Sequence, residues 1–167
     1  PGAGVWSMGR GLARRRGRRM KLETLAYVSR ATPGLGLRDL KHVLRRSREH
    51  NFRARVTGYL VYDGVWFAQL LEGPAASLDA ALARIMADPR HGEIRLLVRQ
   101  PIVQRCFDGW AMGCTNLTAP VHIDTSELRG LIHDFVDGRR LDLPEVQAFF
   151  RSFVEFRTPE ETALLSL

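Results

Sequence analysis

The sequence is poor in the features that define disulfide-stabilised, metal-binding and membrane proteins. It has two cysteines, Cys106 and Cys114, among 167 residues, which is too few for a disulfide framework. Its five histidines do not combine with these cysteines at metal-ligand spacing, so we predict no metal site. No stretch approaches the roughly 18–20 apolar residues of a membrane span. We therefore expect a cytoplasmic protein that makes no membrane contact.

The chain also lacks the short motifs of the common enzyme classes. It has no Gly-rich dinucleotide fingerprint, no Walker loop, no zinc-protease helix and no nucleophile elbow. The segment Gly58–Tyr62 does not match the aromatic strand motif of an RNA-recognition fold. These absences predict that the chain is not an enzyme.

Basic residues are concentrated at the amino-terminal end. The net charge is +7, from 25 Lys and Arg against 18 Asp and Glu, and the pI is near 10.4. Residues 1–20 contain six arginines and no acid, so the rest of the chain is close to neutral. A high pI would normally suggest nucleic acid. Here it comes from a predicted disordered basic arm over 1–20, so the hypothesis of a nucleic-acid-binding protein rests on the arm alone, and we expect no nucleic-acid binding by the rest of the chain.

Hydrophobic periodicity predicts an alternation of strands and helices after the arm. The predicted elements are a strand at Leu22–Ser29, a helix from Leu37 to about His50-Asn51, a hairpin of Val56–Tyr62 and Val65–Glu72 joined by Asp63-Gly64, a helix from Leu78 to Asp88-Pro89, and strands at Glu93–Val103 and Trp110–Leu117. The order β-α-β-β-α-β-β predicts an α+β fold with two helices on one face of a mixed sheet.

Two further helices are predicted, over Asp124–Val136 and Leu143–Phe156. Each begins with a capping-box spacing, Asp124 with Glu127 and Asp142 with Glu145. Each then carries an apolar stripe at helical spacing, so both should cover the open face of the sheet or form a dimer contact. We accordingly divide the chain into an arm (1–20), a core domain (21–118) and a helical segment (119–167).

Two polar residues lie in segments that should be buried. Gln69 sits in the apolar run Trp66–Leu71, and a buried amide without a partner costs about 1–3 kcal/mol. It is either a structural glutamine tied to loop backbone or a polar group aimed at a ligand. Tyr27 shares a strand face with Leu25, and its hydroxyl also needs a partner.

Other noticeable residues have simple structural explanations when taken singly. Asn51 could cap the end of the first helix. Arg84 and Asp88, spaced i and i+4, could form a surface ion pair. Trp110 and Met112, two apart on a predicted strand, should share one face and fill the core.

Taken together, these positions resemble a known family. The segments that carry the resemblance are Leu25–Arg30 (LAYVSR), His50-Asn51, Val56–Gly58 (VTG), Phe67–Gly73 (FAQLLEG), Asp88–His91 (DPRH) and Trp110–Met112 (WAM). In this order they closely resemble the BLUF family of blue-light sensors using FAD, from about Leu22 to Leu117. The resemblance implies a ferredoxin-like fold, with the flavin held between the two helices over the sheet.

The resemblance also implies roles for individual residues. Tyr27 would donate an electron and then a proton to the photoexcited flavin, and Gln69 would bridge that tyrosine to the flavin and rearrange after light. Asn51 would hydrogen-bond the flavin ring. Trp110 and Met112 would relay the state of the glutamine, with either one inward in the dark. The cofactor-binding set it implies is Tyr27, Ser29, His50, Asn51, Gln69, Arg84, Ile85, Asp88 and His91.

The function implied is therefore that of a short, stand-alone blue-light photoreceptor. It would signal through an unidentified downstream protein, with the helices over 119–167 as relay or contact surface, and it would self-associate as a homo-oligomer. The alternative is a light-independent FAD-binding protein or flavoenzyme, which no general acid–base constellation in the sequence supports.

Overall fold

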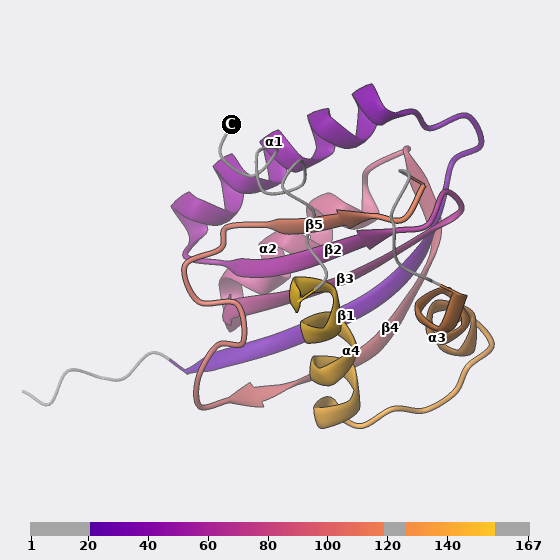
Figure 1. The fold of residues 1–167 in the computed structure, drawn as a ribbon. Coiled ribbons are helices and arrows are strands. Elements are labelled where there is room, and N and C mark those ends of the chain that lie inside the picture. Colours follow the sequence, from indigo (N-terminus) through magenta and orange to yellow (C-terminus); the bar gives the residue numbers. More distant parts are fainter. Residues whose placement is uncertain (1–20, 119–125, 156–167) are drawn as a thin grey trace, which may run out of the picture.

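The computed structural model describes residues 21–118 and 126–155 (Figure 1). The predicted arm (1–20), Asp124 of the first capping box and Phe156 at the predicted end of the last helix lie outside these residues. Within the described ranges, no helix combines the length and apolar character needed to cross a bilayer.

The order of elements follows the prediction. They are β1 (Leu22–Ala31), α1 (Leu37–Ala54), β2 (Thr57–Tyr62), β3 (Trp66–Pro74), α2 (Ala75–Met86), β4 (His91–Ile102), β5 (Gly113–Asn116), α3 (Ser126–Val136) and α4 (Leu143–Glu155). The strands form one sheet in the order β4-β1-β3-β2-β5, in which only the β2–β5 pair is parallel. The predicted α+β fold with a mixed sheet is thus confirmed.

Side chains that alternate along the strands build two separate cores. Leu25 and Tyr27 of β1 point toward α1 and α2, whereas Ala26 and Val28 point to the opposite side. In Figure 1, α2 lies behind the sheet and α1 runs along its upper edge, whereas α4 crosses in front of the sheet and α3 lies at the lower right. We call these two sides the α1/α2 face and the α3/α4 face.

The C-terminal helices cover the sheet face that α1 and α2 leave open. This is the first of the two arrangements predicted for them, the other being a dimer contact. Ile132 and Phe135 of α3 pack with Val146 and Phe150 of α4 in the core of that face. The second predicted capping box is also confirmed, because the Asp142 and Glu145 side chains each accept the other's backbone N–H at 2.9 Å.

Two predicted helix ends are wrong. α1 continues past Asn51 to Ala54 and stops because Arg55 adopts a left-handed conformation (φ 55°), with its N–H bonded to the carbonyls of Asn51 and Phe52. Asn51 is therefore a residue of the helix and not its cap. α2 ends at Met86, so Asp88 lies beyond it; Asp88 precedes Pro89, and a residue before proline is disfavoured in a helix.

The last strand is shorter than predicted. β5 begins at Gly113, and Trp110 and Met112 lie in the connection that leads into it. Strict alternation of side chains holds only inside a strand, so the prediction that Trp110 and Met112 share a face has no basis here. The positions of both side chains are described below.

Candidate functional site

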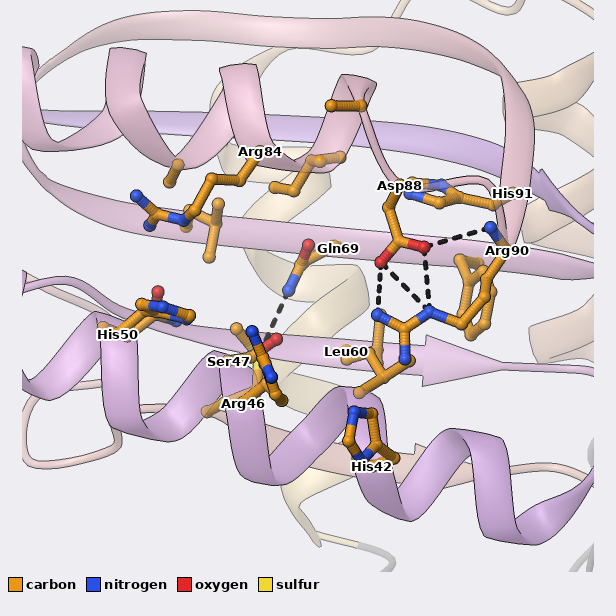
Figure 2. A pocket seen from close by; sticks show the side chains of 18 of the residues that line it. His42, Arg46, Ser47, His50, Leu60, Gln69, Arg84, Asp88, Arg90 and His91 are labelled. Carbon is orange, nitrogen blue, oxygen red and sulfur yellow. Dashed lines mark hydrogen bonds and ion pairs between the residues drawn. The ribbon is translucent and has the colours of Figure 1, made fainter.

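A cavity of about 680 Å³ opens between α1 and α2 over the sheet (Figure 2). Tyr27, Gln69 and Leu60 contribute from the strands, and both helices contribute polar side chains to its walls. All of the predicted site residues line this cavity except Ser29 and Trp110. Residues that are distant in the sequence are thus brought to one place.

The pair Tyr27 and Gln69 forms the polar centre of the cavity floor. The two residues are direct partners in the β1–β3 register, and the Tyr27 hydroxyl donates to Gln69 Oε1. The side chains are 3% and 5% exposed. Burial raises the pKa of Tyr27, and the charge of Asp88 raises it further, so the phenol stays protonated and available as a donor. Each buried polar group therefore has the partner that the sequence left unassigned.

The other end of the Gln69 amide faces Met112. Gln69 Nε2 donates to the Met112 sulfur at 3.3 Å, and Met112 is 2% exposed. A thioether is a weak acceptor, so this N–H is held less firmly than the amide oxygen on the opposite side. The amide is thus bound strongly at one end and weakly at the other.

Backbone carbonyls of the connection before β5 are bound by three different donors. The Trp110 carbonyl accepts from Gly58 N at 3.1 Å, and the Ala111 carbonyl accepts from Asn51 Nδ2 at 2.8 Å. The Met112 carbonyl accepts from Arg48 Nε at 3.1 Å. Asn51 consequently lines the cavity from inside α1 while holding the segment that carries Met112.

Trp110 and Met112 lie on opposite sides of the sheet. Met112 belongs to the core of the α1/α2 face, and it is the inward residue of the pair. The Trp110 ring packs against Tyr59 and Phe107, with centroids 5.8 and 6.2 Å away, in the core of the α3/α4 face. The segment 110–112 therefore joins the two cores.

Asp88 pairs with a residue other than the one the sequence suggested. Its carboxylate is bound by the Arg90 guanidinium, with Nε 2.8 Å from Oδ1 and Nη2 close to Oδ2, and Figure 2 shows Arg84 apart from this pair. The hydrogen bond from Arg90 lowers the pKa of Asp88 and keeps the carboxylate ionised. The surface ion pair between Arg84 and Asp88 is not formed.

His91 connects Ser29 to the cavity wall. Its Nδ1 lies 2.7 Å from the Ser29 hydroxyl, and burial is the main reason that the pKa of His91 is lowered. A lower pKa favours the neutral imidazole at neutral pH. Ser29 therefore reaches the site through His91 and does not line the cavity itself.

Some cavity residues were missed by sequence reasoning. They are Asp39, His42, Arg46 and Ser47 of α1 and Arg90 after α2. The four on α1 precede His50 at helical spacing, beside the apolar stripe of Leu40 and Leu44. A polar row beside an apolar stripe is the signal that could have identified them.

The cavity fits a flavin nucleotide on three counts. Its volume lies within the roughly 300–1,000 Å³ of small-molecule and cofactor sites. Its floor combines apolar Leu60 and Phe67 with the polar Gln69, as a ring with one apolar and one polar edge requires. Arg46 and Arg84 reach the cavity from facing helices and suit an anionic phosphate (Figure 2). In the described ranges, no cluster of His, Cys, Asp and Glu could hold a metal ion.

Comparisons with known proteins agree with this chemistry. The family model of sensors of blue light using FAD (BLUF) matches residues 22–113. Photoactivated adenylate cyclase subunit beta of Euglena longa is 34% identical over 86 residues, which is 52% of this chain and 10% of the cyclase subunit. The chain thus spans about a tenth of this curated relative.

Solved structures give the same result at the level of the fold. The dark-state structure of BlrB, a BLUF protein, is 32% identical with a TM-score of 0.57, covering 87% of this chain and 92% of BlrB. A bacterial light-regulated adenylyl cyclase is 28% identical with a TM-score of 0.64, covering 70% of this chain and 34% of the cyclase. This chain therefore belongs to the BLUF family, whose members sense blue light with FAD as cofactor.

Proposed function

We propose that the chain is a photoswitch in which Tyr27 and Gln69 convert absorption of blue light into a new hydrogen-bond pattern. FAD supplies the absorption of blue light and, once excited, a strong oxidant. The observation that supports the proposal best is the buried hydrogen bond from the Tyr27 hydroxyl to Gln69 Oε1 on the cavity floor.

Tyr27 is suited to give up one electron and then one proton. In the dark its phenol stays protonated, because burial and the nearby Asp88 carboxylate both disfavour the phenolate. Once a phenol has lost an electron it becomes a strong acid, and its proton leaves along the existing hydrogen bond toward Gln69. When the electron and proton return, the phenol is restored and no net oxidation remains.

Gln69 is suited to hold two states. Its oxygen now accepts from Tyr27 and its NH₂ group donates to the Met112 sulfur. Rotation of the amide, tautomerisation or both would turn a donor toward Tyr27 or toward the cavity, and the weak bond to sulfur is the one most easily given up. A new hydrogen bond from Gln69 to the flavin carbonyl would shift the absorption slightly to the red.

The remaining cavity residues would hold the cofactor. Asn51 and His50 approach from α1 and would bind the flavin ring, and Ile85 would pack against it. Arg84 would bind the ribityl-phosphate side of the cofactor. Asp88 would act on that side indirectly, by positioning the Arg90 guanidinium. Ser29 would orient His91.

Spectroscopy on the purified chain tests this proposal. We expect bound oxidised flavin in the dark and a small red shift under blue light that reverts in darkness. Tyr27→Phe should keep the flavin and lose the shift, because the electron and proton donor is gone. Tyr62→Phe is the matched control, since this hydroxyl bonds to the Gly64 carbonyl at 3.0 Å and does not line the cavity. A normal red shift in Tyr27→Phe would contradict the assignment.

The alternative, a light-independent FAD-binding protein or flavoenzyme, gives a different result in the same measurement. It predicts flavin whose spectrum is unchanged by blue light. Two of the groups on the cavity wall are poorly suited to acid–base chemistry, because Asp88 is held in an ion pair with Arg90 and Tyr27 is held protonated.

We further propose that the chain signals to a downstream protein as a homo-oligomer. Residues 21–118 would be the sensor and residues 119–167 the relay. The solved relatives that carry cyclase activity are longer, and the match covers a third of such a chain. Light scattering after size-exclusion chromatography, in the dark and under blue light, measures the number of chains in the assembly.

DNA binding that disappears on deletion of residues 1–19 would assign that activity to the basic arm.

A further inference from the structure

Tyr59 is a buried aromatic residue that the switch described above does not use. It lies on β2, it is fully buried, and its ring belongs to the core of the α3/α4 face. It does not line the cavity. Its contacts nevertheless reach the segment behind Gln69 on one side and α4 on the other.

The Tyr59 ring packs against both ends of the connection that carries Met112. The Trp110 ring lies 5.8 Å away, between centroids, and Gly113 is the partner of Tyr59 in the β2–β5 register. A Cβ atom on Gly113 would lie 2.6 Å from Tyr59 Cε2 and 2.8 Å from Trp110 Cε3, so only glycine fits there. A displacement of the backbone at Met112 therefore has no free space in which to be absorbed before it reaches the Tyr59 ring.

The Tyr59 hydroxyl, at the far end of the same ring, contacts α4. It lies 2.8 Å from Thr115 Oγ1 on β5 and 3.4 Å from the Phe153 carbonyl of α4. A carbonyl can only accept, so Tyr59 donates to Phe153 and accepts from Thr115. Phe153 is in the last turn of α4, where helix carbonyls have no intrahelical donor and depend on an outside one.

We propose that Tyr59 transmits the state of Gln69 through the sheet to the C-terminal turn of α4. The inference rests on the proposed photoswitch and adds a route to it. When Gln69 gives up its bond to the Met112 sulfur, the segment 110–113 shifts and pushes the Tyr59 ring. The hydroxyl then moves away from the Phe153 carbonyl, and the last turn of α4 loses its outside donor. Tyr59 is thus a positioning residue that acts through α4.

A second contact between α4 and the same connection offers a competing route. Arg151 Nη2 lies 3.1 Å from the Cys106 sulfur. Arg151 is exposed and sulfur accepts weakly, so this contact can break without moving the core. The experiment below distinguishes the two routes.

The test measures two quantities on the full chain with FAD bound, in the dark and under blue light. One is the red shift of the flavin, which reports the switch. The other is amide hydrogen exchange in α4 over 146–155, which reports the relay. In the unsubstituted chain we expect the red shift and a light-dependent difference in exchange at α4.

Tyr59→Phe keeps the ring and removes only the hydroxyl. We expect an unchanged red shift and a light-dependent difference at α4 that is smaller by about twofold or more. Tyr62→Phe is the matched control, the same change on the same strand with a hydroxyl that bonds Gly64 and Leu35 instead of α4. It should leave both the red shift and the α4 response unchanged.

Thr115→Val provides a second variant if Tyr59→Phe does not fold or loses flavin. It leaves the phenol in place and removes the group that orients its hydroxyl, and it should also reduce the α4 response. A full α4 response in either folded variant overturns the relay through Tyr59 and favours the Arg151 route. Absence of the red shift in the unsubstituted chain overturns the proposed photoswitch, and this inference with it.

Discussion

The two faces of the sheet differ in how completely they are filled. On the α1/α2 face the helices stand apart and leave a cavity of about 680 Å³ lined by arginines and histidines as well as apolar groups. On the α3/α4 face Phe149 touches three other phenylalanines edge to face, with ring centroids 4.7 to 5.0 Å apart. One face is shaped for a ligand, and the other resembles an ordinary close-packed core.

Under the proposed function, this difference would separate detection of light from transmission of the signal. A cavity wall can change its hydrogen bonds without unpacking a core, whereas a close-packed face passes on small displacements because it has no free volume to absorb them. The strands join the two, since neighbouring residues point to opposite faces. Gln69 faces the cavity and Leu70 faces the phenylalanine cluster.

Truncating the close-packed face should produce the largest loss of stability. Phe150 is fully buried, and Phe150→Ala should lower the free energy of unfolding by about 3–5 kcal/mol because it leaves a void among rings that cannot collapse. Val43→Ala removes a half-buried side chain that already borders the cavity, and it should cost about 1 kcal/mol or less. Urea unfolding of both variants without FAD measures the contrast. Equal losses would show that the two faces are packed alike.

Removing FAD should destabilise the α1/α2 face and leave the α3/α4 face nearly unchanged. A ligand present at 100 times its dissociation constant stabilises the folded state by about 2.7 kcal/mol, and the chain should lose that amount when FAD is stripped. Hydrogen exchange should then rise in α1 and α2, which enclose the cavity, and stay nearly constant in α3 and in α4 before its last turn. A uniform rise over all four helices would mean that the faces are not independent.

The fully buried Glu72 should give a smaller effect at the junction of the faces. Its carboxylate accepts the N–H groups of Cys106 at 2.8 Å and Phe107 at 3.0 Å, which fixes the connection leading to Trp110. Glu72→Gln replaces one acceptor with a donor that faces a backbone N–H. We expect a loss of about 1–3 kcal/mol in the free energy of unfolding and faster exchange at the amides of Cys106 and Phe107.

Glu23→Gln is the matched control for this prediction. Glu23 forms an ion pair with Arg99 at 2.9 Å in which both side chains are partly exposed, so the same chemical change should cost less than about 1 kcal/mol. A loss in Glu72→Gln no larger than in Glu23→Gln would show that the buried carboxylate does not fix the connection.

The sequence predicts the strands, the helices and the faces to which their side chains point. The β2–β3 hairpin, the alternation of Tyr27 with Val28 and the apolar stripes of the last two helices depend on local spacing, and the structure agrees with each. The predicted two-residue turn of that hairpin is wrong by one residue, because the connection includes Val65 as well as Asp63-Gly64. Gln69 could be singled out as a buried amide in need of a partner. Its register with Tyr27 could not be predicted from spacing, because strand pairing depends on residues 42 positions apart.

The errors fall where tertiary contacts override local signals. Asn51 is a residue type that favours helix ends, yet its side chain bonds the Ala111 carbonyl and the helix continues to Ala54, where the left-handed Arg55 ends it. Asp88 is spaced to pair with Arg84, but the turn after α2 brings Arg90 closer. Trp110 and Met112 separate to opposite faces because their segment crosses the sheet edge outside a strand.

Acidification should weaken the α1/α2 face through His91, and this is the smallest effect we predict. Burial lowers the pKa of His91 below its ordinary 6.5, because the imidazole packs near the rings of Tyr27 and Phe67 and loses water that would solvate its charged form. The unfolded chain, whose histidine keeps the ordinary value, then binds a proton first as the pH falls. The free energy of unfolding is therefore highest above about pH 6.5 and declines as the pH falls through the lower pKa of the folded state. Asp88 does not contribute in this window, since the hydrogen bond from Arg90 holds its pKa below 3.8.

Urea unfolding of the FAD-free chain between about pH 7.5 and pH 5 measures the slope of the free energy of unfolding against pH. His91→Gln can keep a hydrogen bond to Ser29 without a titrating group, so it should flatten the slope, and a variant that keeps the original slope would place the pH dependence elsewhere in the molecule.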